Sequence, residues 1–321
     1  MAFLQDAVNE LQMQWSAKPT NTQLVIKPLE WEYTFRIYSL PSLTALYLND
    51  NHFSGKIQKF NSKTLSVVAL KQNQLEGPIP KSLLLHYLTL SQNNLSGQIS
   101  STAYNLKKLL VLDLGSNSLN GTIPQCLGEM RILWILDLSN NNLCGTITTF
   151  RFGNQLYIIK LDENKLEGKI PRSLINCKDL KLLNLGNNQL NDTFPRWLGT
   201  LPSLMIGVDF SVYDNSLTIA TKGLDLSFVR VLRSMNKIIN LSRNRFEGHI
   251  PNMIGDLVGL RTLNLSHNGL EGHIPASLQH LSVLESLDLS SNKIGGEIPP
   301  QLAFLTFLEV LNLSQSSCWM H

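Results

Sequence analysis

An asparagine recurs through most of this 321-residue chain at almost constant intervals, each time closing the pattern L-x-x-L-x-L-x-x-N. The successive intervals are 22, 20, 24, 24, 23, 24, 56, 24 and 24 residues, so a single interval departs from a narrow range. A period of this length predicts stacked copies of one unit, because one unit alone is too short to bury its own leucines. The asparagines that mark the period are Asn51, Asn73, Asn93, Asn117, Asn141, Asn164, Asn188, Asn244, Asn268 and Asn292.

Most units continue as L-x-G-x-I-P, as in LKQNQLEGPIP around Asn73 and LSHNGLEGHIP around Asn268. The L-x-L segment before each asparagine predicts a short strand with alternate side chains inside and outside the core. Glycine permits a turn that other residues resist, and proline fixes φ where the chain leaves that turn. We therefore expect an α/β fold, a leucine-rich-repeat solenoid: a curved right-handed superhelix with a parallel sheet on its concave side and one interrupting island.

The asparagine of each unit has a structural explanation. The turn after the strand takes backbone groups out of water, and an amide side chain offers both donors and an acceptor to replace it. We expect the stacked asparagines to form a hydrogen-bonded ladder along the solenoid. The repeated Leu, Asn, Gly and Pro residues are then scaffold, and function must lie on the exposed positions between them.

Composition and motifs exclude several functions. A hydrophobic content of 43% supports a buried core, and a net charge of +3 without a run of Lys or Arg gives no sign of a nucleic-acid partner. The chain has no G-x-G-x-x-G, no H-R-D with D-F-G, no G-x-S-x-G and no H-E-x-x-H motif, and its 7 histidines are scattered. We therefore expect no catalytic residues, no cofactor and no metal site.

The four cysteines, Cys126, Cys144, Cys177 and Cys318, match no C-x-x-C metal or redox pattern. We expect them to be buried free thiols. A disulfide bond between Cys126 and Cys144 is the alternative, and the sequence does not decide between the two.

The unit L-x-x-L-x-L-S-x-N-x-L-x-G-x-I-P resembles the plant-specific class of leucine-rich repeats, which forms the ectodomains of plant receptor-like proteins and receptor-like kinases. Three segments are more narrowly similar to receptor-like proteins of the Cf type, and the resemblance covers roughly residues 40–315. These segments are TIPQCLGEM at 122–130, SLINCKDLKLLNLGNNQLNDTFPRWLGTLPSL at 173–204 and YDNSLTIATKGLDLSFVRVLRSMNKIINLSRNRFEGHIP at 213–251.

This resemblance implies an immune receptor on the extracellular face of the plasma membrane, with a short cytoplasmic tail and no kinase domain. It implies a peptide, protein or glycan elicitor as ligand, in pathogen recognition and defence signalling. It also implies that a co-receptor kinase docks on residues 213–313.

The 56-residue interval predicts the domain organisation. A step of 24 residues from Asn188 reaches Val212, and Gly207 and Asp209 stand where apolar residues are due. We expect an atypical N-terminal segment at 1–39, a first block of repeats at 40–204, a non-repeat island at 205–235, a second block at 236–315 and a truncated tail at 316–321. Residues 1–39 resemble neither the signal peptide nor the cap of the family, and no membrane helix follows the last unit. We therefore expect a receptor truncated at both ends, with the membrane reached only through a missing C-terminal helix.

Exposed positions of the strands are the expected binding surface, because their side chains are free of the scaffold. Trp134 and Tyr157 occupy equivalent positions of consecutive repeats, so we expect them to be neighbours and a contact site, since aromatic residues often anchor interfaces. Asp162 and Glu163, beside Lys160, read instead as a solvated face. The ligand-binding candidates are Tyr47, Lys71, His86, Trp134, Tyr157, Lys160, Lys181, Arg243, Arg261, His267 and Glu285.

Six N-x-S/T sequences are candidate glycosylation sites in a secreted protein: Asn94, Asn120, Asn191, Asn240, Asn264 and Asn312. The last three share one strand position, where sugars would crowd the concave face. The alternative is that N-L-S arises from the repeat pattern itself.

Two other functions remain open at the level of sequence. One is a secreted inhibitor of a microbial cell-wall-degrading enzyme, which uses the same class of repeat but has no island. The other is a non-functional fragment of a receptor gene, which the missing caps and the break near residue 207 favour.

Overall fold

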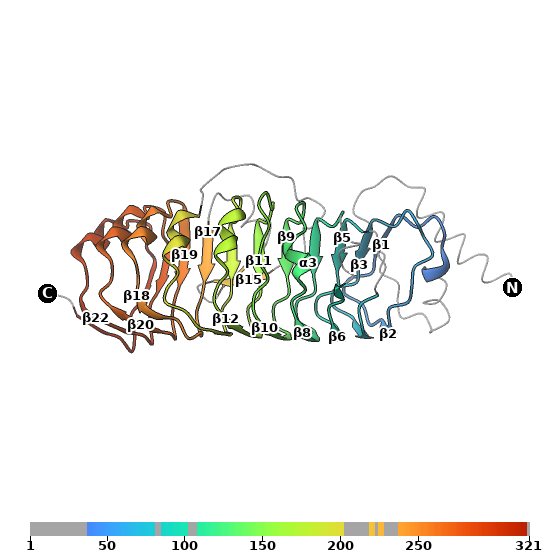
Figure 1. The fold of residues 1–321 in the computed structure, drawn as a ribbon, viewed down its shortest axis with the longest axis horizontal. Coiled ribbons are helices and arrows are strands. Elements are labelled where there is room, and N and C mark those ends of the chain that lie inside the picture. The colour runs from blue at the N-terminus through green and yellow to red at the C-terminus, as the bar shows by residue number, and fades with distance from the viewer. Residues whose placement is uncertain are drawn as a thin grey trace.

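The computed structural model describes residues 37–80, 85–101, 108–201, 218–221, 224–227 and 237–319. These residues wind into a stack of similar coils that runs along the long axis of the molecule (Figure 1). Residues 1–36, the expected break at 205–211 and most of the expected island lie outside the described residues. The stack confirms the predicted α/β leucine-rich-repeat solenoid.

The main sheet follows the chain order of the repeats. Within the described residues it has 11 strands, and every neighbouring pair is parallel. Its strands are β1 (Ala45–Tyr47), β3 (Val67–Ala69), β5 (Tyr87–Thr89), β7 (Val111–Asp113), β9 (Ile135–Asp137), β11 (Ile158–Lys160), β13 (Leu182–Asn184), β17 (Lys237–Asn240), β19 (Leu260–Asn264), β21 (Ser286–Asp288) and β23 (Val310–Asn312).

A second set of short strands forms after the asparagine turns. Among the described residues it splits into a 7-stranded and a 4-stranded sheet, again in chain order. The first contains β2 (Ser54–Lys56), β4 (Gln74–Gly77), β6 (Asn94–Gln98), β8 (Ser118–Thr122), β10 (Asn142–Gly145), β12 (Lys165–Gly168) and β14 (Gln189–Leu190). The second contains β18 (Glu247–His249), β20 (Gly269–Gly272), β22 (Lys293–Glu297) and β24 (Ser317–Trp319).

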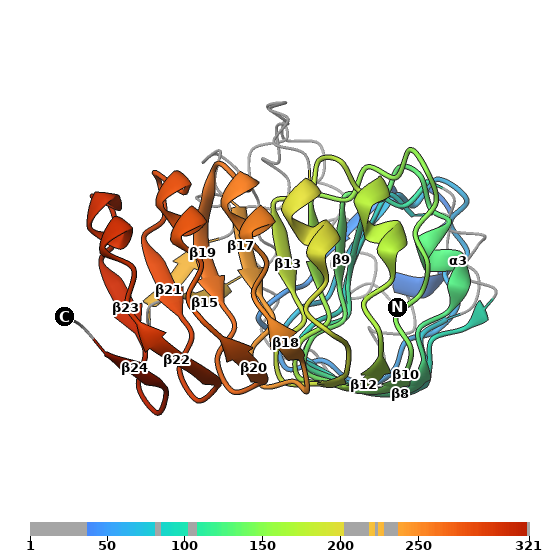
Figure 2. The ribbon, with the colours of Figure 1, turned by 60° about the vertical axis from the view of Figure 1, so that its left-hand side comes forward.

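Short helical turns cover the convex side, and each begins directly after the proline of the repeat. Proline suits this place because its fixed φ starts a turn and its missing N–H would have no partner there. Figure 2 shows these turns stacked along one edge of the solenoid. They are α3 (Gln125–Gly128), η2 (Arg172–Asn176), η3 (Arg196–Thr200), η5 (Asn252–Asp256), η6 (Ala276–His280) and η7 (Pro300–Phe304).

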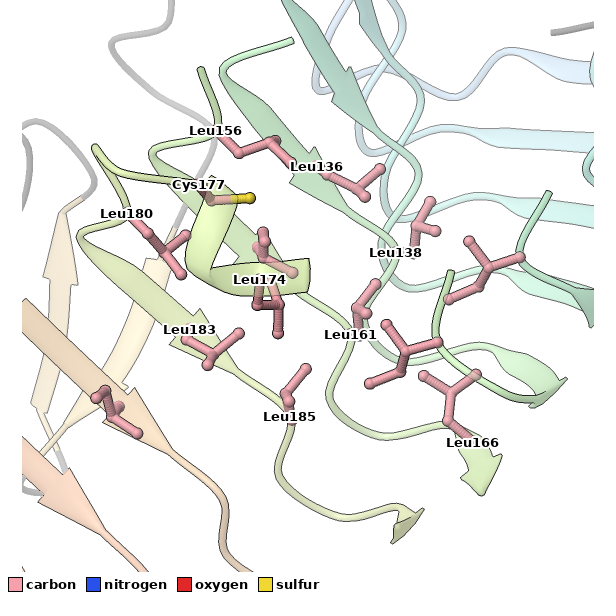
Figure 3. Close-up of a cluster of buried hydrophobic side chains, with 14 of the residues drawn as sticks. Leu136, Leu138, Leu156, Leu161, Leu166, Leu174, Cys177, Leu180, Leu183 and Leu185 are labelled. Carbon is pink, nitrogen blue, oxygen red and sulfur yellow. The ribbon is translucent and has the colours of Figure 1, made fainter. Parts of the chain in front are cut away.

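The core is one continuous column of leucines between the main sheet and the convex turns. Each repeat sends the central residue of its strand and the leucine after it inward, as Leu136 and Leu138 do in one repeat and Leu183 and Leu185 do two repeats later (Figure 3). The Cys177 side chain completes this packing and is fully buried. Burial of a leucine of this kind stabilises the fold by roughly 1.5–3 kcal/mol, and each repeat depends on its neighbours for that burial.

The asparagine ladder runs through the stack. The Asn117 amide donates to the carbonyl oxygens of Leu114 at 3.0 Å and of Leu90, in the preceding repeat, at 3.0 Å. Its Oδ1 accepts the backbone N–H of Leu95 at 3.0 Å. Asn73 through Asn292 repeat this pattern, as seen at Asn141 and Asn292. Each amide therefore joins its own turn to the preceding one.

The long interval does not interrupt the main sheet. Strand β13 pairs directly with β17, with Leu183 opposite Ile239. Asn244 makes the same ladder bonds across the interval, to the carbonyl oxygen of Leu185 at 2.9 Å and from the N–H of Leu190 at 3.1 Å. The described part of the interval contains an antiparallel pair, β15 (Thr218–Thr221) with β16 (Leu224–Ser227). The main sheet and the asparagine ladder are therefore continuous across the long interval.

The second sheet does break at this point. Asp192 stands where other repeats have glycine at positive φ, such as Gly168 at 76° and Gly248 at 78°. A residue with a Cβ rarely adopts that conformation, and here a single bridge between Thr193 and Glu247 replaces a strand pair. The Asp192 carboxylate lies 3.4 Å from the ammonium group of Lys169.

Candidate ligand-binding face

The face of the main sheet turned away from the leucine core is organised in rows, because equivalent repeat positions pair in register. We name four rows. In the repeat of β9, the first row is Ile135, the first residue of the strand, and the leading row is Trp134, the residue before it. The second row is Asp137, two residues after Ile135, and the third row is Ser139, two residues further on. Every repeat contributes one residue to each row.

The first row is apolar in the middle of the solenoid. Val111, Ile135, Ile158 and Leu182 are fully buried and form a cluster separate from the main core. Tyr87, Leu110 and Trp134 pack against this cluster, and Tyr157 belongs to it. The centre of the concave face is therefore an apolar band flanked by aromatic side chains.

The expected neighbours Trp134 and Tyr157 do lie side by side. The Tyr157 N–H donates to the Trp134 carbonyl oxygen at 2.8 Å, and the Trp134 indole N–H donates to Gln155 Oε1 at 3.4 Å. The expectation that both are exposed is wrong for Tyr157, which is only 6% exposed. It is buried because it packs into the apolar band, whereas Trp134 is half-buried at the edge.

The second row carries the charges. Asp113 of β7, Asp137 of β9 and Lys160 of β11 are aligned in register on three adjacent strands. The Lys160 ammonium group lies 2.9 Å from Asp137 Oδ2. Asp137 Oδ1 also accepts the N–H of Ser139 at 3.0 Å and its hydroxyl at 2.5 Å. Ser91 donates its hydroxyl to Asp113 Oδ2 at 2.7 Å, so this row is closely hydrogen-bonded.

Burial controls the protonation of this row. Asp113 is 1% exposed, and burial together with the Asp137 charge raises its pKa to about 6. Burial also raises the pKa of Asp162, in the third row, to about 7, although Lys160 opposes the shift. Burial lowers the pKa of Lys160, but Asp137, Asp162 and Asp113 together raise it above its ordinary value. The interpretation of Asp162 and Glu163 as a solvated face is therefore wrong for Asp162, which belongs with Lys160 to a mostly buried charge cluster, whereas Glu163 is exposed.

The remaining candidates fall in different rows. His86, Lys181, Arg261 and Glu285 share the leading row with Trp134, and there Arg261 pairs with Glu285 at 2.5 Å. Tyr47 lies in the second row and Lys71 in the third, where burial lowers the pKa of Lys71. These side chains share the concave face, but they are spread over many repeats.

Arg243 and His267 are not strand residues. Each stands directly before its ladder asparagine, in the left-handed turn, with φ of 51° and 54° respectively. Glu163 occupies the same kind of turn with φ of 54°. All three are exposed, so the expected place of Arg243 and His267 on the strands is wrong, while Glu163 is exposed to solvent as expected.

Sequence reasoning missed Asp113, Asp137 and Lys237. The two aspartates could have been found by aligning the repeats in columns, which places D, D and K at one position of consecutive units. Lys237, in the leading row, is 8% exposed and donates to the Leu201 carbonyl oxygen at 3.0 Å. Burial lowers its pKa to about 8.

The six N-x-S/T asparagines form two groups. Asn94 and Asn120 are exposed on the second sheet, and Asn191 is exposed just after β14. Asn240, Asn264 and Asn312 lie in the second row of the concave face and are partly buried. In this group the amide oxygen accepts the N–H of the serine two residues on, as Asn264 does from Ser266 at 3.0 Å.

None of the four cysteines forms a disulfide bond, so the Cys126–Cys144 alternative is not realised. The expectation of burial holds for Cys177 but is wrong for Cys144, which is exposed on β10, while Cys126 and Cys318 are intermediate. Burial raises the pKa of the Cys177 thiol to about 12. Among the described residues, no group of three His, Cys, Asp or Glu side chains is placed to hold a metal ion, and no helix is long and apolar enough to span a bilayer.

Known proteins with related sequences share this repeat. Models of the leucine-rich-repeat family match residues 84–143 and 237–294, and residues 179–201. Receptor-like protein Cf-9 of Solanum pimpinellifolium is 67% identical over 55 residues, which are 17% of this chain and 6% of that protein. Receptor-like protein Cf-9 homolog of Solanum lycopersicum is 74% identical over 46 residues, which are 14% of this chain and 5% of that protein. The aligned segments thus span only a small part of these relatives.

Solved structures agree with the sequence relatives. The ectodomain of the Arabidopsis receptor kinase HAESA, solved in complex with the peptide hormone IDA and the co-receptor SERK1, superposes with a TM-score of 0.71 and 31% sequence identity. The superposition covers 86% of this chain and 42% of that chain. The chain is thus built from leucine-rich repeats and is similar to plant receptor-like proteins and to the ectodomain of a plant receptor kinase.

Proposed function

We propose that this chain is a non-catalytic, ligand-recognising part of a receptor ectodomain on the extracellular face of the plant plasma membrane. The observation that carries the proposal is the contrast between scaffold and concave rows. The leucines and ladder asparagines are nearly constant from repeat to repeat, whereas the second row changes from Asp113 and Asp137 to Lys160 and Asn184. Such a surface can be specific for one ligand while the fold stays the same.

The ligand class follows from two sources. The HAESA complex contains a peptide hormone, which supports a peptide or protein ligand for a concave face of this kind. The similarity to Cf-9 supports an elicitor of pathogen origin and a role in defence signalling. A protein on the extracellular face can carry glycans, and we place them on the exposed asparagines of the second sheet. Glycans at these positions would leave the concave face open.

The test uses a random 12-residue peptide library displayed on phage and the whole chain secreted from plant cells. We expect peptides that protect β7, β9 and β11 from hydrogen exchange and that lose binding when Trp134 is changed to Ala. The matched control is Phe152→Ala, because Phe152 is 73% exposed but lies on a loop outside the concave rows. Failure to select any peptide that binds the concave strands would contradict the proposal.

A partner kinase is the second element of the proposal, and residues 213–313 are its docking region. Phe304 and Phe307, at the end of this region, are 70% and 60% exposed, and exposed large apolar side chains can mark interaction surfaces. The co-receptor SERK1 in the HAESA complex supports this role. We expect a Phe304→Ser/Phe307→Ser variant to lose binding of the SERK1 ectodomain, and Phe152→Ser to keep it. Equal binding by both variants would contradict the docking region.

A further inference from the structure

The acidic cluster of the concave face has more negative than positive charge. We define it as Asp113, Asp137 and Asp162, which come from three consecutive repeats around Lys160. Lys160 is bound to Asp137 Oδ2, and the charge of Asp113 acts on the half-buried Lys71. With both lysines counted, three carboxylates face two ammonium groups, so the ionised cluster keeps one unbalanced negative charge.

Asp162 departs from the pattern of its row. In four other repeats the third-row residue is a serine that donates its hydroxyl to the second-row side chain of the same repeat, as Ser139 does to Asp137 and Ser290 to Asp288 at 2.7 Å. The repeat of Asp162 has Lys160 in its second row and a carboxylate in place of the serine. The scaffold therefore does not explain this carboxylate.

One oxygen of the Asp162 carboxylate also lacks a donor. Its Oδ1 is buried and accepts no hydrogen bond in the described structure. A buried polar atom without a partner costs roughly 1–3 kcal/mol, and more when it is charged, so a folded protein rarely leaves one unless a ligand completes it. This observation is independent of the charge count, and it points to a donor that arrives from outside.

A glycine occupies the third-row position next to the cluster. The third-row position beside Ser139 is Gly115, where a side chain would begin 3.1 Å from Asp137 Oδ1 and 3.1 Å from the Ser139 hydroxyl. Its backbone N–H donates to Asp113 Oδ1 at 3.2 Å. Gly115 is thus closely packed against Asp137 and Ser139, so a larger side chain at this position would crowd the cluster.

We propose that the acidic cluster binds an arginine or lysine side chain of the peptide ligand. This inference rests on the proposed function, since it assumes that the concave face is where the ligand lies. A guanidinium group suits the cluster because it presents several N–H donors in one plane to carboxylate oxygens. A metal ion does not suit it, since Lys160 already occupies Asp137 and the cluster has no metal-ligand geometry.

The test measures binding of acetyl-Gly-Arg-Gly-amide and of its citrulline counterpart, which has nearly the same shape without the charge, by ligand-observed NMR at pH 7.5. We expect the arginine probe to bind at least tenfold more tightly than the citrulline probe. Asp162→Asn should remove most of this preference, and it should still fold because it takes away a buried charge whose Oδ1 accepts no hydrogen bond. Asp256→Asn is the matched control, since Asp256 is exposed on η5 of the convex side.

Equal binding of the two probes, or an unchanged preference in Asp162→Asn, would overturn the inference. The peptide library separates this failure from that of the proposed function. Selected peptides that bind the concave strands but show no enrichment of Arg or Lys leave the receptor role standing and remove the acidic cluster as the site of a basic residue. Absence of any concave-face peptide, together with equal probe binding, removes both.

Discussion

The Asn244 amide donates a hydrogen bond to the carbonyl oxygen of Leu185, 59 residues earlier in the chain, at 2.9 Å. The same bond in neighbouring repeats spans 27 residues, as from Asn268 to Leu241. The solenoid is therefore continuous in space where it is discontinuous in sequence. Two predictions follow directly from this ladder.

Asn141→Ala should strongly destabilise the solenoid. It removes donors from the carbonyl oxygens of Leu114, Leu138 and Ser139 and an acceptor from the N–H of Leu119, all in a buried turn. Unsatisfied buried groups of this kind cost about 1–3 kcal/mol each, so we expect a loss of about 2–4 kcal/mol in the free energy of unfolding. Urea unfolding followed by circular dichroism measures it. Asn142→Ala, at an exposed position of the next strand, should change the value by less than about 0.5 kcal/mol.

Removal of residues 205–236 should leave a folded, continuous solenoid. This deletion of 32 residues shortens the 56-residue interval to 24 and joins Leu204 to Lys237, which restores the sequence spacing of a regular repeat. Because β13 already pairs with β17, no strand has to move. The deleted protein should unfold cooperatively and keep its far-ultraviolet spectrum. A molten or aggregated product would show that residues 205–236 are needed for the stack.

Stability should fall as the pH rises from about 4 to about 7, because of the acidic cluster. The folded-state pKa values of Asp113, about 6, and Asp162, about 7, lie above those of an unfolded chain. Between these limits the folded state holds protons that the unfolded state has released, so their contribution is full at low pH and is lost as the pH passes the raised values. Each unit of pKa difference is worth about 1.4 kcal/mol.

Asp162→Asn isolates this effect, because its amide does not titrate. We expect the variant to be more stable than the wild type at pH 8 and to show a flatter dependence of the unfolding free energy on pH. Asp256→Asn, exposed on the convex side, should reproduce the wild-type curve. An unchanged slope in Asp162→Asn would mean that this carboxyl titrates normally.

Glycosylation should distinguish the two groups of N-x-S/T asparagines. In protein secreted from plant cells we expect glycans on Asn94, Asn120 and Asn191, which are exposed on or next to the second sheet. We expect none on Asn240, Asn264 and Asn312, because they are partly buried and their amide oxygens are held by the following serine. Enzymatic deglycosylation in ¹⁸O water with peptide mass spectrometry reports each site. High occupancy at Asn264 would refute this assignment.

The scaffold could be predicted from the sequence repeat, since the same leucines and asparagines must meet in every coil. The repeat did not reveal how deeply the side chains of the concave face are buried. Tyr157 and Lys160 occupy outward positions, yet they are buried or nearly so because side chains of adjacent repeats surround them. Such burial depends on which residues become neighbours across the sheet, and a single repeat does not contain that information. Arg243 and His267 illustrate a second cause, because the strand ends earlier than the leucine pattern does.

The ladder bonds have a direction. The N–H of Leu95 finds its acceptor only in Asn117 of the next repeat, and the N–H of Leu119 only in Asn141 of the one after. Each coil is thus completed by the coil that follows it, never by one further away. A ribosome releases this chain in the same order, so every newly emerged unit can dock on its predecessor before the rest has been synthesised. Assembly of the solenoid can therefore keep pace with translation.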